Sequence, residues 1–160
     1  MSSVDMIQKF IEYHHAMTRR VWDSIDQITE EQFLADDTYS RGSIRNLMAH
    51  LCNTDLNWLT GLKNLPDIRP SLKKYEEYPD RASVLAYWES VVNDVTEYVN
   101  HLSETDLNEN PKDIDAPRWT VLLHLVNHGT DHRSTVLQQL HELGAPTFDQ
   151  DFILWLWSRK

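Results

Sequence analysis

Apolar side chains in the first 28 residues recur at steps of three or four positions, which is the spacing of one face of an α-helix. The residues that share this stripe are Ile7, Phe10, Met17, Val21, Ile25 and Ile28. His14 occupies a step that the stripe leaves empty, no glycine precedes Gly42, and no proline precedes Pro66. The pattern predicts a long amphipathic helix, followed at Thr29 and Gln32 by the capping-box spacing of a short further turn.

A second helix is predicted from Ser43, a favourable N-cap residue, to about Leu62. Its apolar face consists of Ile44, Leu47, Met48, Leu51, Trp58, Leu59 and Leu62. The segment 64–80 that follows is interrupted by prolines and is predicted to be a loop. Its length suits a crossover between two pairs of helices.

The third helix shows the clearest pattern, a heptad-like seam formed by Val84, Trp88, Val91, Val95, Tyr98 and Leu102. Such a seam is expected for a helix that packs at a shallow angle in a bundle. A fourth helix is predicted from near Thr120 to Gly144, with Pro146 just beyond it as a termination signal. The apolar tail 152–157, FILWLW, is expected to form a last turn or two of helix that packs back on the others.

No segment shows the period-two alternation of a strand, so the predicted fold is an all-α four-helix bundle with a long crossover between the second and third helices. The 160 residues suit one domain, 1–160. A formal net charge of -10 disfavours a nucleic-acid partner. We expect no signal peptide and no membrane span. The single cysteine, Cys52, suits a reducing compartment, so a cytoplasmic location is expected.

The histidines are the residues most able to carry chemistry, and three of them lie on the fourth predicted helix at four-residue steps: His124, His128 and His132. Residues four apart lie on one helix face, about 6 Å apart along the axis, so two neighbouring imidazoles can converge on one metal ion. The outer two are about 12 Å apart along the axis, so one of the three must be excluded.

A helical wheel indicates which one. The apolar residues of this helix share one side of the wheel: Val121, Leu125, Val136, Leu140 and Leu143. His132 falls among them and His128 at their border, whereas His124 lies further round, toward solvent. Gly129 also lies on the inward side and is expected to leave space for a ligand or a metal.

Three neutral imidazoles with open coordination positions form a catalytic-type zinc site, and they also suit nickel or iron. The third ligand should come from another helix. His50 lies at the edge of the second apolar face and His14 on the first stripe, and spacing does not choose between them. The alternative for each is an ordinary core histidine held by hydrogen bonds. The remaining histidines are predicted to be solvated and without a role: His15, His101 and His141.

Two stretches of the sequence carry longer motifs. Residues 121–146, VLLHLVNHGTDHRSTVLQQLHELGAP, contain a His, a Gly-Thr pair, a variable residue and a His-Arg pair, followed by an apolar helix that ends in Gly. Residues 43–59, SIRNLMAHLCNTDLNWL, carry a single His on a helix. These stretches and the tail DFILWLW resemble the corresponding segments of the DinB/YfiT-like family of metal-dependent proteins.

The resemblance implies a four-helix bundle with a long crossover, often assembled as a homodimer. It implies one divalent metal ion on His50, His128 and His132, and so favours His50 over His14. Zinc or nickel is the first candidate for the ion, with iron or manganese next. Asp131 stands where many members have His, but it points away from the site on the wheel.

Relatives within this family include thiol-dependent transferases and an isomerase that use bacillithiol, mycothiol or glutathione. The first hypothesis is therefore a metal-dependent thiol S-transferase, with small-molecule electrophiles as substrates and a low-molecular-weight thiol as cosubstrate. A metal-dependent hydrolase is an alternative, but it needs a base near the ion, and Asp55 and Asp131 are both predicted to lie off the inward faces. A non-catalytic metal-binding stress protein is the third possibility. Cys52 is predicted to be a small core residue that points away from His50, so the thiol would come from outside.

Overall fold

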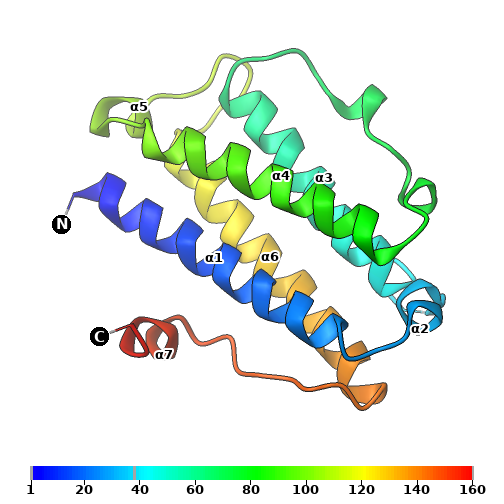
Figure 1. The fold of residues 1–160 in the computed structure, drawn as a ribbon. Helices are drawn as coiled ribbons and strands as arrows, with labels where there is room; N and C mark the ends of the chain where they lie inside the picture. Colours follow the sequence, from blue (N-terminus) through cyan, green and yellow to red (C-terminus); the bar gives the residue numbers. More distant parts are fainter. Residues whose placement is uncertain (1, 38, 160) are drawn as a thin grey trace.

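Four long helices form the body of the molecule in the computed structural model, which describes residues 2–37 and 39–159 (Figure 1). They are α1 (Ser3–Ile25), α3 (Ile44–Leu62), α4 (Arg81–Asn100) and α6 (Arg118–Glu142). The shorter elements are α2 (Glu30–Leu34), α5 (Glu104–Asn108), α7 (Phe152–Trp157) and two 3-10 turns, η1 (Arg69–Ser71) and η2 (Tyr75–Glu77). The described residues contain no strand, and the all-α prediction is confirmed. None of these helices is long and apolar enough to cross a bilayer.

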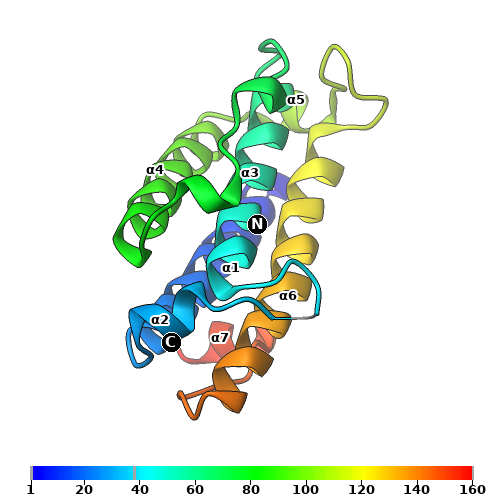
Figure 2. The same cartoon turned by 90° about the vertical axis from the view of Figure 1, so that its right-hand side faces the viewer.

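The long helices surround one core, in which α1 contacts α4 and α6, and α3 contacts the same two helices. The segment 63–80 between α3 and α4 runs along the length of the bundle, as Figures 1 and 2 both show, so α3 and α4 lie parallel to each other. This segment is the predicted crossover, and its two 3-10 turns give it local structure. One of these turns, η2, packs against α3 and so lies beside the histidine of that helix.

The helix ends follow the local signals of the sequence. The side chain of Ser43 accepts a hydrogen bond from the first turn of α3, and Thr29 caps α2 in the predicted capping box. Helix α6 begins directly after Pro117, two residues before the predicted start. It ends just before Gly144, whose φ of 78° is a left-handed conformation that glycine adopts without strain.

The seam of α4 lies in the core as predicted for Val84, Trp88, Val91 and Val95. At the end of this helix Val99 is buried in place of Tyr98, whose hydroxyl donates a hydrogen bond to the carbonyl oxygen of Leu62 at 3.2 Å. Leu143, which we expected on the apolar side of the last long helix, is exposed because α6 ends before it. Leu143 thus lies beyond its helix, whereas Val99 lies inside α4, four residues after Val95, where the buried face departs from the strict seven-residue repeat.

The C-terminal tail packs on α1, as predicted. Phe152 stacks on Phe10 with ring centroids 4.5 Å apart, and Trp155 meets Tyr13 edge to face at 5.6 Å. The hydroxyl of Tyr13 also donates a hydrogen bond to the carbonyl oxygen of Gln150, just before α7. These contacts hold the tail against the outer side of α1, where α1 faces away from α4 (Figure 1).

Candidate metal centre

Three histidines converge where α3 meets α6. His50 comes from α3, and His128 and His132 come from α6, and one ring nitrogen of each lies within 4.8 Å of the others. The Nε2 atoms of His50 and His128 face each other at 3.2 Å, and the rings of His128 and His132 have centroids 4.4 Å apart. The structure thus brings together the three residues that the family motifs nominated, and all three are half-buried.

The donor set fits a divalent cation. In a tetrahedral zinc site with Zn–N bonds of about 2.0–2.1 Å, two ligand nitrogens lie about 3.3 Å apart, and the facing atoms of His50 and His128 match this separation. Burial lowers the pKa of His50 to about 3 and that of His128 to about 4, and it also lowers the pKa of His132. The three rings are therefore neutral at neutral pH, which is the form that offers a lone pair to a metal.

His50 is oriented by a residue of the crossover. Its Nδ1 lies 3.0 Å from the hydroxyl oxygen of Tyr75 in η2. If Nε2 faces the other two histidines, Nδ1 carries the ring proton and donates it to Tyr75, an arrangement that fixes the tautomer of metal-binding histidines. Sequence reasoning missed Tyr75, because nothing local to residues 64–80 indicates that this loop folds back onto His50.

The outward residues of α6 lie where the wheel placed them. His124 is exposed and meets Trp58 edge to face, with ring centroids 5.4 Å apart. Asp131 is exposed as well. Neither belongs to the cluster of converging ring nitrogens.

His14 has a different environment from the one expected of a reserve ligand. It is only 2% exposed, and Arg133 Nη1 donates to its Nδ1 at 2.8 Å while its Nε2 lies 3.2 Å from Asp55 Oδ2. Gly129 does face inward, but the expectation that it leaves room for a metal is wrong. A Cβ atom at this position would lie 2.2 Å from Cε1 of His14, so the imidazole of His14 already fills that space.

Asp55 corrects a second expectation, because this carboxylate is only 4% exposed rather than off the inward face. Helix α3 is enclosed by α2, α4, α6 and the crossover turn η2, so its buried arc is much wider than the single face of a wheel. Burial raises the pKa of Asp55 to about 6. It also lowers the pKa of Arg133, which is fully buried, to about 10, so the guanidinium stays charged at neutral pH.

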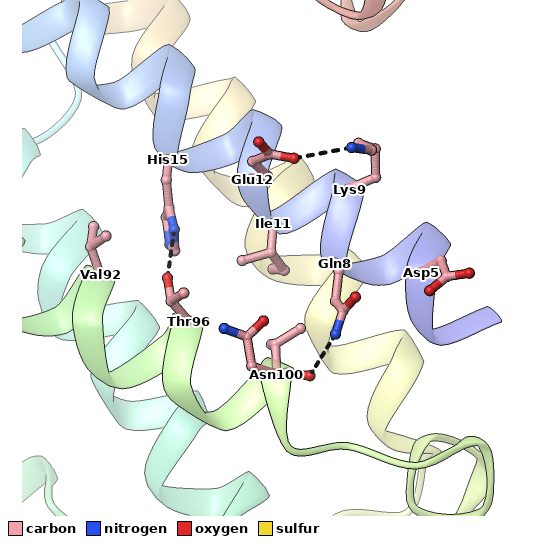
Figure 3. A pocket seen from close by; sticks show the side chains of 10 residues that line it. Asp5, Gln8, Lys9, Ile11, Glu12, His15, Val92, Thr96 and Asn100 are labelled. Carbon is pink, nitrogen blue, oxygen red and sulfur yellow. Dashed lines mark hydrogen bonds and ion pairs between the residues drawn. The ribbon is translucent and has the colours of Figure 1, made fainter. Parts of the chain in front are cut away.

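The prediction that His15 is solvated is also wrong. His15 is half-buried in a hollow between α1 and α4, where its Nδ1 lies 3.4 Å from Thr96 Oγ1 (Figure 3). Burial lowers the pKa of His15 to about 3. His101 and His141 are exposed, as predicted. This hollow includes none of the three converging histidines.

Comparison with known proteins agrees with the motifs. The sequence model of the DinB family matches residues 1–159. The chain belongs to the DinB family. Among its DinB relatives is Protein DinB from Bacillus subtilis (strain 168), which is 22% identical over 166 residues, an alignment that covers 98% of this chain and 96% of the relative. The family resemblance inferred from the two histidine-bearing stretches is thus confirmed over residues 1–159.

Proposed function

We propose that this DinB-family protein binds one divalent metal ion, zinc or nickel in first place, on His50, His128 and His132, and acts as a thiol S-transferase on small electrophiles. The observation that supports this most is the convergence of one neutral ring nitrogen from each histidine at the contact between α3 and α6. When bound, the ion would supply the Lewis acidity that favours the thiolate form of an external thiol.

Small molecules can approach the three histidines from solvent. All three side chains are half-buried rather than enclosed. An open polar hollow on α6 also includes one of them, and its lining residues are His124, Asn127, His128, Thr130, Asp131 and Ser134. Three protein ligands leave at least one coordination position free in a site of this kind, so access from solvent supports a catalytic rather than a purely structural role.

The sulfur would come from outside the protein. Cys52 is only 1% exposed, and burial raises the pKa of its thiol well above the usual range, so it is neither accessible nor ionised. In the transfer, the external thiol loses its proton to solvent and its sulfur forms a bond to the electrophilic carbon. The leaving group departs with the electron pair of the bond that breaks. The protein's part is to hold the reactants close to His50, His128 and His132.

Hydrolysis is the second candidate, and His124 is the observation that favours it. A hydrolase needs a base within reach of the attacking water. Asp55 is buried against His14, whereas Asp131 lines the same hollow as His124 and, like it, is outside the histidine cluster. His124 lines the polar hollow, and its ring centroid lies 5.6 Å from that of His128. A hydrolase would therefore lose its activity in His124→Ala, whereas thiol binding would not depend on this residue.

Cobalt offers a spectroscopic test of the thiol reaction. The untagged protein is loaded with Co²⁺ and titrated with low-molecular-weight thiols at millimolar concentration. We expect the visible spectrum to change as sulfur enters the coordination sphere, and we expect the same change in Cys52→Ser. If no thiol alters the spectrum, the transferase proposal is wrong. Hydrolysis, or metal binding without catalysis, then remains as the candidate function.

A further inference from the structure

A chain of buried polar groups runs from α6 through α1 to α3. Arg133 Nη1 donates to His14 Nδ1 at 2.8 Å, and His14 Nε2 lies 3.2 Å from Asp55 Oδ2. Arginine has only N–H donors, so the Nδ1 atom of His14 must be the acceptor in the first contact. The ring proton of His14 is therefore on Nε2, and it is donated to Asp55. This fixes Asp55 as the acceptor at the end of the chain.

This chain of polar groups passes next to His128, one of the two histidines that α6 contributes to the proposed metal site. The ring of His14 lies against the backbone of Gly129, the residue that directly follows His128. Asp55 is attached to the far nitrogen of that ring and so lies between α1, α3 and α6.

Asp55 and His128 each carry one atom that has no hydrogen-bond partner among the described residues. In Asp55 it is Oδ1, the carboxylate oxygen that His14 does not use, and in His128 it is Nδ1; Nδ1 of His132 is unpaired as well. The Asp55 and His128 atoms are both buried, and a buried polar atom without a partner destabilises the folded state. The atoms are complementary: when Nε2 of His128 serves as a ligand, Nδ1 carries a proton and needs an acceptor, and a carboxylate oxygen is the preferred one.

We propose that Asp55 is a positioning residue of the metal centre, whose free Oδ1 accepts the Nδ1 proton of His128 directly or through one water molecule. The proposal rests on the proposed three-histidine metal site. In this arrangement Asp55 fixes the tautomer of His128 and turns Nε2 toward His50. Arg133 and His14 in turn hold Asp55 in place. Tyr75 contacts Nδ1 of His50 in the way that we propose for Asp55 and Nδ1 of His128.

Asp55→Asn is the direct test, because asparagine keeps the size of the side chain but not two acceptor oxygens. One side of an amide is a donor, so it cannot accept from His14 and His128 together. Zinc affinity is measured on untagged protein by competition with a chromophoric chelator at pH 7.5. We expect Asp55→Asn to bind zinc about 10- to 100-fold more weakly than wild type. Asp23→Asn, which removes an exposed carboxylate of α1 far from the three histidines in the sequence, is the matched control and should change the affinity only slightly.

A nuclear magnetic resonance readout separates positioning from a general loss of packing. In zinc-loaded wild type with ¹⁵N-labelled histidine, His128 should carry its proton on Nδ1, and this proton should be protected from exchange with water. The signal should shift or become exchangeable in Asp55→Asn. If that variant does not fold, the wild-type spectrum decides alone, because a freely exchanging Nδ1 proton on His128 would overturn the proposal.

The outcomes for the metal site and for Asp55 are distinct. If wild type binds no zinc, or if His50→Ala binds zinc as tightly as wild type, the metal centre is wrong and the role of Asp55 is wrong with it. If zinc binding depends on His50 but Asp55→Asn leaves affinity and the His128 signal unchanged, the metal centre stands and the positioning role alone is refuted.

Discussion

The imidazole of His14 lies directly against the backbone of Gly129, so that a Cβ atom at position 129 would come within 2.2 Å of Cε1 of the ring. The ring cannot easily move aside, because Arg133 holds one of its nitrogens and Asp55 lies against the other. Helices α1 and α6 are thus fitted together at this glycine. The close approach also allows a buried arginine and a buried carboxylate to share one neutral histidine between them.

Gly129→Ala should destabilise the protein. The added methyl group must push the His14 ring out of its place, and overpacking of this kind costs about 1–3 kcal/mol. Alanine gains up to about 1 kcal/mol in helix propensity, so the net loss is smaller than the steric cost alone. The free energy of unfolding in urea measures the effect.

Gly61→Ala is the matched control, since it makes the same change in a helix with an easier neighbour. A Cβ atom there meets only the side chain of Ile114, with Cδ1, the end of this flexible side chain, at 3.1 Å and Cγ1 at 3.9 Å. We expect this variant to be as stable as wild type or slightly more stable. Equal losses in both variants would show that the fit of His14 against Gly129 has no special role.

Arg133 should be among the most sensitive positions for stability. Its guanidinium is fully buried and donates to His14, Thr18, Thr130 and Gln150. Arg133→Met removes these bonds and takes a positive charge away from the neighbourhood of the buried Asp55 carboxylate. Each buried partner left unsatisfied costs about 1–3 kcal/mol. Thermal or urea unfolding measures the loss.

Arg69→Met is the control for Arg133→Met, because it makes the same substitution at an exposed arginine. Arg69 forms an ion pair with Asp67 on the surface of the crossover, at 2.8 Å, and both side chains are exposed. Arg69→Met should unfold at the same urea concentration as wild type, because exposed pairs contribute little. If Arg133→Met is as stable as Arg69→Met, the buried contacts from Arg133 through His14 to Asp55 do not stabilise the protein as argued.

Cys52 should be unreactive in the folded protein. The side chain is buried in the core, and burial raises the pKa of its thiol, so the reactive thiolate is not populated. Ellman's reagent at pH 8 should therefore detect no thiol in native protein and one thiol per chain in guanidinium chloride. Rapid labelling under native conditions would show that Cys52 is accessible and would reopen the question of where the sulfur comes from.

The sequence was sufficient for the features that depend on local spacing. The stripes and caps predicted the four long helices and the crossover, because periodicity and N-cap chemistry act within a few residues. The position of each histidine relative to the apolar side of the helical wheel also placed His128 and His132 inward and His124 outward on α6. His50 needed the family motif, since no local rule relates residues on different helices. The single domain and the homodimer stay predictions.

The remaining parts of the site come from packing between distant elements. Tyr75 reaches His50 only because the crossover folds along α3. Asp55 lies inside because α3 is enclosed on several sides, which a one-faced wheel cannot represent. Arg133 could have been noticed as a charged residue on an inward helical position, four residues after Gly129. Its partner His14 lies on another helix, and only the fold shows that the two meet.

Metal content is the measurement that tests the central claim most directly. Protein produced without a histidine tag, and never exposed to a nickel column, is analysed by inductively coupled plasma mass spectrometry together with three variants. We predict about one divalent ion per chain in wild type and in His124→Ala, and loss of most of the ion in His50→Ala and His132→Ala, because each removes one of three ligands. Metal-free wild type, or an ion that disappears in His124→Ala and persists in His132→Ala, would contradict the account.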